Sequence, residues 1–421
     1  MPTIDLIKTA ASQFQLDLTD ECAALLASEV PPAIVAGSSG GKDSSVLVIR
    51  LNQFLNALHY QGERLIVHAD LGRIEHVESI DHVRKLAAFV GWPLLIAKRE
   101  KGDLLDRYEQ RWHDNCTRYA LLECVNLISP FPAPMSPFCR SEVKVAPIVQ
   151  AVTKRFPGQI IISCVGLRAE ESNARAKKPI FRLNDKFQRR NGSRGFDWHP
   201  IHNTTIEQVF LTHRKAGFPL HPQYLRGNER LSCSFCFLGS KNDLTHGAEV
   251  QTNHESYRII SALEIRSSFS YQQNAWLADL RPDLLSPDLR QQLRLTKIKA
   301  TERRLAETGV PEECLFKNNG GRRGWPERQP TIAECELIAG ARQEIDRLFG
   351  NEIFQTTGLR IRHLTAPEVY NRYNQLLTQR PPTNDLPLFH TPELPTLTQE
   401  LAVIHANRNQ AATITLQSAT L

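Results

Sequence analysis

The sequence has 421 residues and a net charge of +6, with 41% hydrophobic and 23% charged residues. This length exceeds what one compact core usually holds, so we expect two or more domains of a soluble, globular type. No apolar run is long enough to span a bilayer, and the first residues, "MPTIDLIKTAASQFQLDLTDE", carry acids without the long apolar core of a signal peptide. We therefore expect a cytoplasmic protein with no membrane partner.

Short β-rich runs alternate with helical patterns through the first half of the chain. Strands are expected at residues 33–36, 64–68, 94–97 and 159–165, and helices near residues 44–58, 75–90, 117–127 and 142–155. This rhythm predicts an α/β fold in which helices cover both faces of a parallel, twisted sheet. Ligands of such sheets bind at the carboxyl ends of the strands.

Four segments are expected along the chain. Residues 1–30 are expected to form an N-terminal helical segment, and residues 31–240 the α/β domain. Strand signals then fade, and stretches such as "TIAECELIAGARQEIDRLF" predict a mainly helical domain over residues 241–380. Residues 381–421, with the proline-rich "PPTNDLPLFHTPELP", are expected to be a tail or an arm that binds a partner.

The stretch "IVAGSSGGKDSSVLVI" (34–49) joins the first predicted strand to the first predicted helix. Its spacing fits neither the G-x-G-x-x-G loop of dinucleotide sites nor the G-x-x-x-x-G-K-[ST] Walker loop. Glycine N–H groups can still converge on one point, and the following helix adds its unpaired N-terminal donors. Lys42 adds positive charge, whereas Asp43 would repel a phosphate and is expected to hold Mg²⁺ or the loop itself. The stretch predicts an anion-binding loop made of Gly37, Ser39, Gly40, Gly41, Lys42, Asp43, Ser44 and Ser45.

The run "SGGKDSS" resembles the pyrophosphate loop (PP-loop) of the adenine-nucleotide α-hydrolase-like enzymes. These enzymes have a parallel sheet of the PP-loop, or HUP-like, type. The resemblance implies that the chain binds ATP with Mg²⁺, cleaves it between the α- and β-phosphates, and adenylylates a substrate. It also implies that the loop grips the departing pyrophosphate.

Further stretches follow the order found in relatives of phosphoadenylylsulfate (PAPS) reductase, over about residues 33–240. "HADLGRIEH" (68–76) resembles H-x-D-T-G, "FCRSEVKVAPI" (138–148) resembles C-x-x-x-x-K-x-x-P, and "VGLRAEESNAR" (165–175) resembles G-x-R-x-x-E-S-x-x-R. "WHPIHNTTIEQVF" (198–210) resembles P-I-x-x-W-[ST]-x-x-x-V, and "LHPQYLRGNERLSCSFC" (220–236) resembles P-x-Y-x-x-G-x-x-R-x-x-C-x-x-C. The resemblance adds these nucleotide-binding residues: Asp70, Lys144, Gly166, Arg168 and Glu171.

Lys42, Asp43 and Arg168 are the implied catalytic residues. Arg168, Glu171 and Arg175 are spaced as on one helix face, which predicts a local ion-pair ladder. By the resemblance, Arg168 instead contacts the nucleotide phosphates and Glu171 fixes it. Asp70 is either a contact to Mg²⁺ or adenosine, or an ordinary strand-end cap.

Departures from the family pattern narrow the function. Leu71 replaces the threonine of H-x-D-T-G, and Asn203 replaces the tryptophan of the fourth stretch. The E-C-G-[IL]-H segment with the reductases' catalytic cysteine has no match, because "AECELIAG" around Cys335 has helical periodicity and no Gly-His after it. A nucleotide site without that segment resembles the ATP pyrophosphatases of DNA phosphorothioate modification, the DndC/SspD type.

That resemblance implies adenylylation of a DNA backbone phosphate before sulfur transfer. It implies a separate cysteine desulfurase as sulfur donor, and other subunits of a modification complex as partners. Three other functions stay open: a reductase of activated sulfate that uses an outside thiol, an RNA thiolation enzyme, and a nucleic-acid-binding module with structural ATP.

Nine cysteines are spread along the chain, and only Cys233 and Cys236 have C-x-x-C spacing. By the resemblance, these two and Cys139 are expected to hold a four-iron–four-sulfur cluster. Zinc, a persulfide, a redox disulfide and inert core thiols are the alternatives. Phe138 stands where some relatives have a second cysteine, so no fourth ligand is evident. Three further cysteines lack motif support: Cys116, Cys124 and Cys164.

A basic segment lies between Arg168 and Arg194, where nine Lys or Arg accompany three acids. This local excess equals the net charge of the whole chain. It predicts either a patch that binds nucleic-acid phosphates or a solvated surface loop. The candidate DNA contacts are Arg175, Lys177, Lys178, Arg189 and Arg190.

Overall fold

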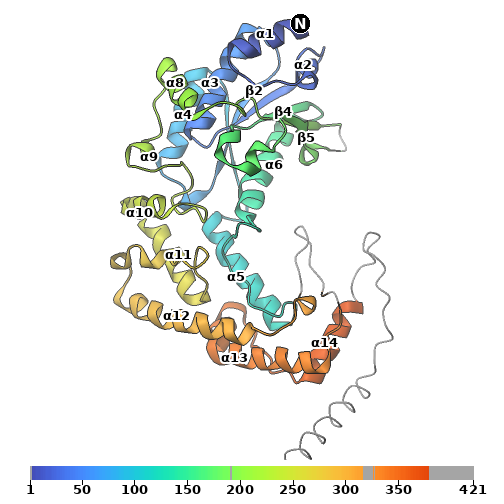
Figure 1. Cartoon of the computed structure of the whole chain (residues 1–421), viewed down its shortest axis with the longest axis vertical. Coiled ribbons are helices and arrows are strands. Elements are labelled where there is room, and N and C mark those ends of the chain that lie inside the picture. Colours follow the sequence, from blue (N-terminus) through green and yellow to red (C-terminus); the bar gives the residue numbers. More distant parts are fainter. Residues whose placement is uncertain (1, 190–191, 316–325, 327, 379–421) are drawn as a thin grey trace, which may run out of the picture. The chain divides into compact units, whose positions relative to one another are not determined.

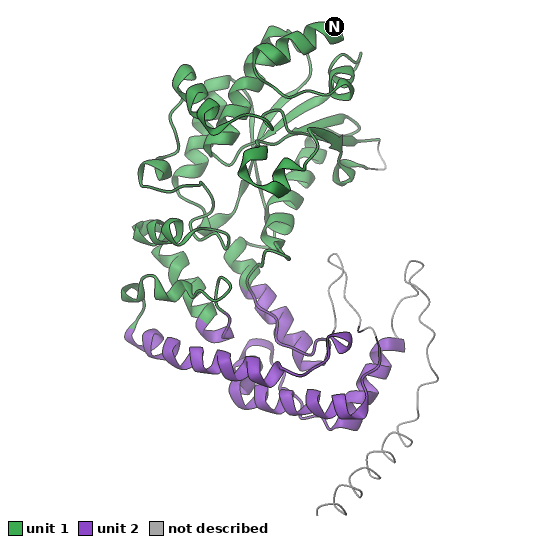
Figure 2. Ribbon diagram, viewed as in Figure 1, with its two compact units in different colours: residues 1–108, 131–264, 270–286 green, residues 109–130, 265–269, 287–421 purple. Residues whose placement is uncertain are grey.

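The computed structural model describes residues 2–189, 192–315, 326 and 328–378 (Figure 1). Contacts divide the chain into two compact units (Figure 2). The first comprises residues 1–108, 131–264 and 270–286, and the second residues 109–130, 265–269 and 287–421. The domain boundaries expected from the sequence stay predictions, and the expected tail or arm, residues 381–421, lies outside the described residues.

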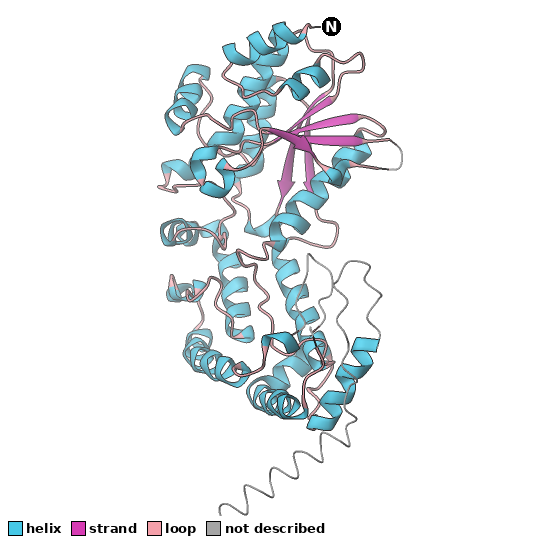
Figure 3. Ribbon diagram, turned by 45° about the vertical axis from the view of Figure 1, so that its right-hand side comes forward, coloured by secondary structure: helices cyan, strands magenta, loops and turns pink. Residues whose placement is uncertain are grey.

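The first unit is built on a six-stranded sheet in the order β3-β2-β1-β4-β6-β5 (Figure 3). Five strands are parallel, and β5 alone runs antiparallel to its neighbour β6. This confirms the predicted α/β fold with a mostly parallel sheet. The strands are β1 (Ala33–Gly37), β2 (Arg64–Asp70), β3 (Leu94–Lys98), β4 (Ile160–Cys164), β5 (Phe181–Leu183) and β6 (Arg194–Trp198).

β1 lies at the centre of the sheet and pairs with β2 on one side and β4 on the other. The chain runs outward from β1 through β2 to β3, and then returns to the other side of β1 as β4. The connections after β1 and β4 therefore leave in opposite directions and open a crevice at the carboxyl ends of these strands. In open α/β sheets this is where ligands bind.

Helices cover both faces of the sheet. Ile34 and Ala36 of β1 pack with side chains of α1, α3, α4 and α8, whereas Ala33 and Val35 pack with those of α6. This alternation follows the two-residue period of a strand and explains why β1 is hydrophobic throughout. The helices that begin in this unit are α1 (Ile4–Gln13), α2 (Asp20–Leu26), α3 (Lys42–Ala57), α4 (Glu78–Val90), α5 (Leu104–Ala120), α6 (Ala146–Arg155), α7 (Asn173–Ala176), α8 (Ile206–Ala216), α9 (Pro222–Leu225), α10 (Lys241–Glu249) and α11 (His254–Ser267).

The helix expected at residues 117–127 is wrong in position, because α5 spans Leu104–Ala120. The chain reverses at Leu122, whose φ is 53°, and the side chain of Leu122 enters the core of the second unit. A helical signal for α5 was present in its buried residues, which recur every three or four positions: Leu105, Tyr108, Trp112, Cys116 and Tyr119. The residues between these positions are mostly polar, so the segment as a whole does not look hydrophobic and its helical spacing was overlooked.

The second unit is mainly helical, as predicted for the C-terminal region. It contains α12 (Pro287–Glu307), α13 (Ile332–Thr357) and α14 (Ala366–Thr378). Side chains of α13 and α14 form one core with Leu122 and Val125. Cys335 lies inside α13 and is fully buried, which agrees with its helical surroundings in the sequence. Among the described helices, none is both long and apolar enough to cross a membrane.

Candidate active site

The loop between β1 and α3 turns at Gly40, whose φ of 79° lies in the left-handed region that favours glycine. A side chain there would also lie 3.5 Å from both His221 and Val83. α3 then begins at Lys42, at the carboxyl end of the central strand. The predicted loop therefore sits at the sheet position where ligands bind.

Three consecutive backbone N–H groups follow this turn. The N–H of Gly40 donates to the Ser38 hydroxyl at 3.3 Å, and the N–H of Gly41 donates to the Ser39 hydroxyl at 3.4 Å. The N–H of Lys42 donates to the Tyr224 hydroxyl at 3.2 Å. Each donor thus meets a single hydroxyl oxygen at a long distance, and a phosphate oxygen is a stronger acceptor. Such a set of donors suits an anion.

The serines of the loop have different surroundings. Ser39 is exposed, and its hydroxyl lies beside the glycines. The Ser44 hydroxyl donates to the Gly41 carbonyl at 2.9 Å, and among the described residues no side chain caps the N-terminus of α3. The Ser45 hydroxyl is buried and has no hydrogen-bond partner within the part of the chain that the structure describes.

Tyr224, in α9, was not among the predicted site residues. Besides accepting the Lys42 N–H, it places its ring 5.2 Å from the Lys42 ammonium. The Lys42 side chain is only 11% exposed, and its ammonium lies 3.4 Å from Asp43. The P-x-Y spacing of "LHPQYLRG" was the available signal, since it placed this tyrosine in a family motif.

Asp43 joins the loop to the segment after β4. Its carboxylate accepts a hydrogen bond from Nε of Arg168 at 2.6 Å. Arg168 is nearly buried, and its Nη1 also donates to Glu170 at 2.7 Å and to the Thr204 carbonyl at 3.3 Å. Burial lowers the pKa of Arg168, but Asp43 and its other acidic neighbours outweigh burial and raise it. Asp43 was expected to hold either Mg²⁺ or the loop itself, and these contacts agree with the second role.

Gly166 allows this close approach. A Cβ at Gly166 would lie 3.1 Å from the Asp43 carbonyl oxygen and 3.2 Å from the Ser44 Cα. Both are backbone atoms at the start of α3, so they cannot move aside as a side chain would. Gly166 and Arg168 therefore do come together with the predicted loop residues, at the carboxyl ends of β1 and β4.

The prediction that Arg168, Glu171 and Arg175 share one helix face is wrong. A 3₁₀ turn at Ala169–Glu171 ends before α7, because Ser172 is extended and caps α7. Glu171 accepts the backbone N–H of Arg168 at 3.2 Å and forms an ion pair with Arg175. Glu171 thus fixes the backbone of Arg168, while Glu170 binds its guanidinium.

β2 ends at Asp70, and a turn follows. The Asp70 carboxylate accepts the Gly72 N–H at 2.8 Å, which is the strand-end cap considered from the sequence. Nearby, His68 lies 2.8 Å from the Ser38 carbonyl through Nδ1 and 3.0 Å from Glu75 through Nε2. Burial opposes protonation of His68, but Glu75 and the carbonyl outweigh it and raise the pKa. His68 therefore ties this turn to the loop after β1.

The two departures from the family pattern have structural roles. Leu71 is buried and its N–H donates to Glu75 at 3.1 Å. Asn203 donates through its backbone and its side-chain amide to Asp17, both at 2.8 Å. Asn203 thus anchors the N-terminal helical segment to the sheet domain.

The thiols of Cys139, Cys233 and Cys236 affect one another's pKa, so the three lie within electrostatic range of one another. Cys139 begins a π-helix at Cys139–Val145, and the other two flank a tight turn. A hydrogen bond from Cys233 lowers the pKa of Cys236, helped by Lys144 and Arg230, whereas the pKa of Cys233 is raised. Lys144 accordingly lies beside the thiols.

This set does not form a ready metal site. Within the described ranges, no group of three or more His, Cys, Asp or Glu side chains is arranged to hold a metal ion. Cys164 packs in the sheet core together with Cys22, and Cys116 and Cys124 are buried in the second unit. The four-iron cluster therefore stays a prediction.

Glu264 indirectly supports the C-x-x-C turn. It is fully buried, and it accepts the backbone N–H groups of Tyr271, Leu277 and Ala278 at 2.6, 2.9 and 2.9 Å. The loop held in this way returns to the turn, because the Tyr271 hydroxyl donates to the Phe235 carbonyl. The side-chain amide of Gln272 donates to the carbonyls of residues 237 and 239, both at 2.9 Å.

Residues 33–238 match the phosphoadenosine phosphosulfate reductase domain, and this range contains the loop, Arg168 and all three cysteines. Residues 33–238 form a PAPS reductase-like PP-loop domain. A curated relative is the uncharacterized 37.8 kDa protein in the gpa 5' region of Escherichia phage 186, 24% identical over 56% of this chain and 78% of that protein.

The comparison with solved structures gave further matches. The PAPS reductase of Candida auris, a phosphate complex, is 15% identical over 55% of this chain and 96% of that chain, with a TM-score of 0.33. FMN adenylyltransferase of Candida glabrata with FMN and the ATP analog AMPCPP is 11% identical over 55% and 72%, with a TM-score of 0.32. The U34-tRNA thiolase NcsA of Methanococcus maripaludis with its [4Fe-4S] cluster is 14% identical over 70% and 80%, with a TM-score of 0.34.

The basic segment of the PP-loop domain forms an edge of the sheet. β5 and β6 make a hairpin that was not predicted, because both strands are short and rich in polar residues. Lys177, Lys178 and Arg189 are exposed, while Arg175 pairs with Glu171. Arg190 lies outside the described residues. Basic side chains on an edge strand also prevent edge-to-edge pairing, so the two predicted roles of this segment stay open.

Three histidines pack behind Gly40 in the PP-loop domain. The ring of His221 lies 5.2 Å from that of His82 and 6.3 Å from that of His76, between centroids. Burial is the first cause that lowers the pKa of each, to about 4 for His76 and His82 and to about 3 for His221. Nδ1 of His221 accepts the Gln223 N–H at 3.2 Å, which requires an unprotonated nitrogen there.

We expect this histidine group to make the domain sensitive to acid. The unfolded chain binds these protons near the ordinary histidine pKa of 6.5, and the folded chain only near pH 4. The free energy of unfolding should therefore fall as pH decreases from 6.5 towards 4, by about 1.4 kcal/mol per unit of pKa shift for each group. Urea denaturation across this range measures the loss. His82→Phe, which keeps an aromatic ring without a charge, should show a smaller loss, and an equal loss would contradict the assignment.

Proposed function

We propose that this chain is an ATP pyrophosphatase that adenylylates a DNA backbone phosphate and so activates it for sulfur transfer. The observation that carries the proposal is the loop at the carboxyl end of β1, where three consecutive N–H groups face weak hydroxyl acceptors and the Lys42 ammonium lies beside the Tyr224 ring. A loop of this kind stabilises the negative charge of a leaving pyrophosphate.

In the proposed reaction, an oxygen of the acceptor phosphate attacks the α-phosphorus of ATP. The bond from that phosphorus to the bridging oxygen breaks, and pyrophosphate leaves with the electron pair. Lys42 and the N–H groups of residues 40–42 hold the leaving group, while Asp43 and Arg168 keep the loop in place. Mg²⁺ bound to ATP would neutralise phosphate charge, but the described residues contain no arranged metal site.

The outer sulfur of a persulfide on Cys236 then attacks the activated phosphorus, and AMP leaves with the electron pair of its bond to that phosphorus. The thiol of Cys233 next attacks Sγ of Cys236, the S–S bond breaks, and the phosphorothioate is released as the Cys233–Cys236 disulfide forms. An external thiol reduces this disulfide and completes the cycle. Cys236 is the residue suited to carry this sulfur, because its lowered pKa favours the thiolate that accepts sulfur from a donor. A separate cysteine desulfurase supplies the sulfur in this proposal. No step passes through a metal cluster.

The test measures the products of ATP in the presence of different acceptors. AMP and pyrophosphate should appear in equal amounts, and DNA should raise the rate. Stimulation by RNA alone would transfer the proposal to RNA thiolation, and sulfite release from adenylyl sulfate would favour the reductase. ATP that stays intact with every acceptor would overturn the proposal.

The exposed basic residues of the β5–β6 edge favour a nucleic-acid acceptor over a small one. We expect the triple variant Lys177→Ala, Lys178→Ala, Arg189→Ala to weaken DNA binding and to flatten its salt dependence. Each lost phosphate contact should reduce the slope of log K against log salt by about 0.9. Fluorescence anisotropy with a labelled duplex at several salt concentrations measures the slope.

A matched control replaces three exposed lysines elsewhere in the first unit, Lys85, Lys101 and Lys215. The control removes the same charge, so only a local role of the edge segment makes the two variants differ. Equal salt slopes for both variants would return the segment to the solvated-loop interpretation.

A further inference from the structure

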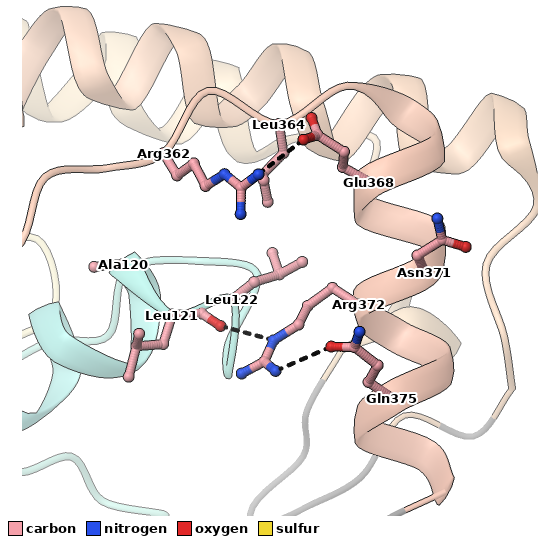
Figure 4. Close-up of a pocket in the computed structure, with 9 residues that line it drawn as sticks. All are labelled: Ala120, Leu121, Leu122, Arg362, Leu364, Glu368, Asn371, Arg372 and Gln375. Atoms are coloured by element: carbon pink, nitrogen blue, oxygen red, sulfur yellow. Dashed lines mark hydrogen bonds and ion pairs between the residues drawn. The ribbon is translucent and has the colours of Figure 1, made fainter.

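The second unit contains a cavity of about 420 Å³, and its lining residues on and before α14 lie outside the match to the reductase domain (Figure 4). It lies between the end of α5, the segment before α14 and one face of α14. Leu122 and Leu364 give it an apolar part, and four polar side chains surround this part: Arg362, Asn371, Arg372 and Gln375. A volume of this size is ordinary for a small-molecule site.

The cavity has more guanidinium than carboxylate groups. Its one acid, Glu368, accepts the Thr365 N–H at 2.9 Å and the Thr365 hydroxyl at 3.0 Å, and so caps α14. The same carboxylate pairs with Arg362 at 2.9 Å. The Arg372 guanidinium has no carboxylate partner among the lining residues, because it donates to the Leu121 carbonyl at 3.2 Å and reaches the Gln375 amide oxygen at 3.5 Å.

Arginines also neutralise the negative end of α5, which would otherwise repel an anion. Arg342 donates to the carbonyls of residues 119 and 120 at 2.7 and 3.2 Å, and Arg372 donates to the carbonyl of Leu121. The turn itself is strained, since Leu122 has a φ of 53°, where glycine is usual. Burial of Leu122 in the core maintains this conformation.

Asn371 and Gln375 lie one turn apart on α14, and the amide oxygen of Gln375 is the one that Arg372 reaches (Figure 4). Carboxamides offer paired donor and acceptor atoms to the edge of a base, guanidinium groups suit phosphate oxygens, and leucines suit the flat face of a ring. From this combination we propose that the cavity binds a nucleoside monophosphate unit, with its phosphate at Arg362 and Arg372. The unit is either a free nucleotide or one nucleotide of a nucleic-acid strand.

The experiment uses the full chain carrying Lys42→Ala, so that the PP-loop contributes less to nucleotide binding. Fluorescent AMP and a fluorescent single-stranded 12-mer are titrated separately into this protein. Arg362→Gln and Asn371→Leu, added one at a time, should each weaken binding of at least one probe by about tenfold, which corresponds to 1.4 kcal/mol. Their side chains are exposed, so the fold should survive, and melting temperatures check this.

Arg294→Gln is the matched control, because Arg294 is exposed on α12 of the same unit and does not line the cavity. Weakening confined to AMP identifies a free nucleotide, and weakening confined to the 12-mer identifies a strand; both support the site. The site is refuted when Arg362→Gln and Asn371→Leu change neither probe's affinity more than Arg294→Gln does. The titrations involve no turnover, so a failure of ATP cleavage in the wild-type protein would not affect them.

Discussion

Replacement of Lys42 by alanine is expected to lower the rate of pyrophosphate release by at least about a hundredfold. The Lys42 ammonium is held between the Tyr224 ring and the Asp43 carboxylate at the start of α3. A positive charge fixed there, and largely shielded from water, stabilises the negative charge that develops on the leaving pyrophosphate. Release of pyrophosphate from ATP, followed with a coupled phosphate assay, measures the effect.

Two controls separate this loss from damage to the fold. Lys215→Ala removes an exposed lysine of the same unit and should keep the wild-type rate. Tyr224→Phe keeps the ring near Lys42 but removes the hydroxyl that accepts its N–H, so a smaller loss is expected. Near-normal turnover by a folded Lys42→Ala protein would remove the basis of the pyrophosphate-loop assignment.

Replacement of Cys236 by serine is expected to abolish sulfur transfer while ATP cleavage persists. The hydrogen bond from Cys233 lowers the pKa of Cys236 and raises that of Cys233, so we expect Cys236 to ionise more readily than Cys233. Cys236 should therefore be alkylated first by iodoacetamide, which mass spectrometry can locate. Cys164→Ser is the control, because Cys164 lies in the sheet core.

The cluster prediction gives a different result in the same experiments. A four-iron cluster would make the anaerobically purified protein brown, and serine at Cys139, Cys233 or Cys236 would remove the colour. Iron in the wild-type protein would thus favour the cluster over a free thiolate at Cys236. Absence of added sulfur on Cys236 after incubation with a persulfide donor would contradict the role proposed for this residue.

The first four strands were predictable because local signals determine them. A hydrophobic run such as Ala33–Ala36 is buried on both faces, and the glycine loop after it has a spacing that few other structures require. The hairpin of β5 and β6 was missed because both strands are short and β5 lies at the edge, where polar residues are tolerated. The helix expected at 117–127 failed because tertiary burial of Leu122 overrides the local helical pattern.

The candidate site was predictable only in part, for a similar reason. Sequence motifs named Lys42, Asp43 and Arg168, but they did not reveal that the first two are held by residues far along the chain. Tyr224 is 182 residues from Lys42, and only its motif spacing marked it. The histidines behind the loop carry no motif at all, and Glu264 supports the cysteine turn through another loop.

The contacts that shape the PP-loop have a consequence for how the protein folds. Arg168 reaches Asp43 across 125 residues, His213 approaches the Lys42 carbonyl at 3.0 Å across 171, and Tyr224 binds the Lys42 N–H across 182. Contacts between residues so far apart in sequence form late in folding. The chain must lose the conformational entropy of closing a large loop before the contact can stabilise it. During synthesis, the loop sequence leaves the ribosome long before its supports exist. A nascent chain that ends before Arg168 should therefore have no nucleotide affinity, and ATP binding would report completion of the domain.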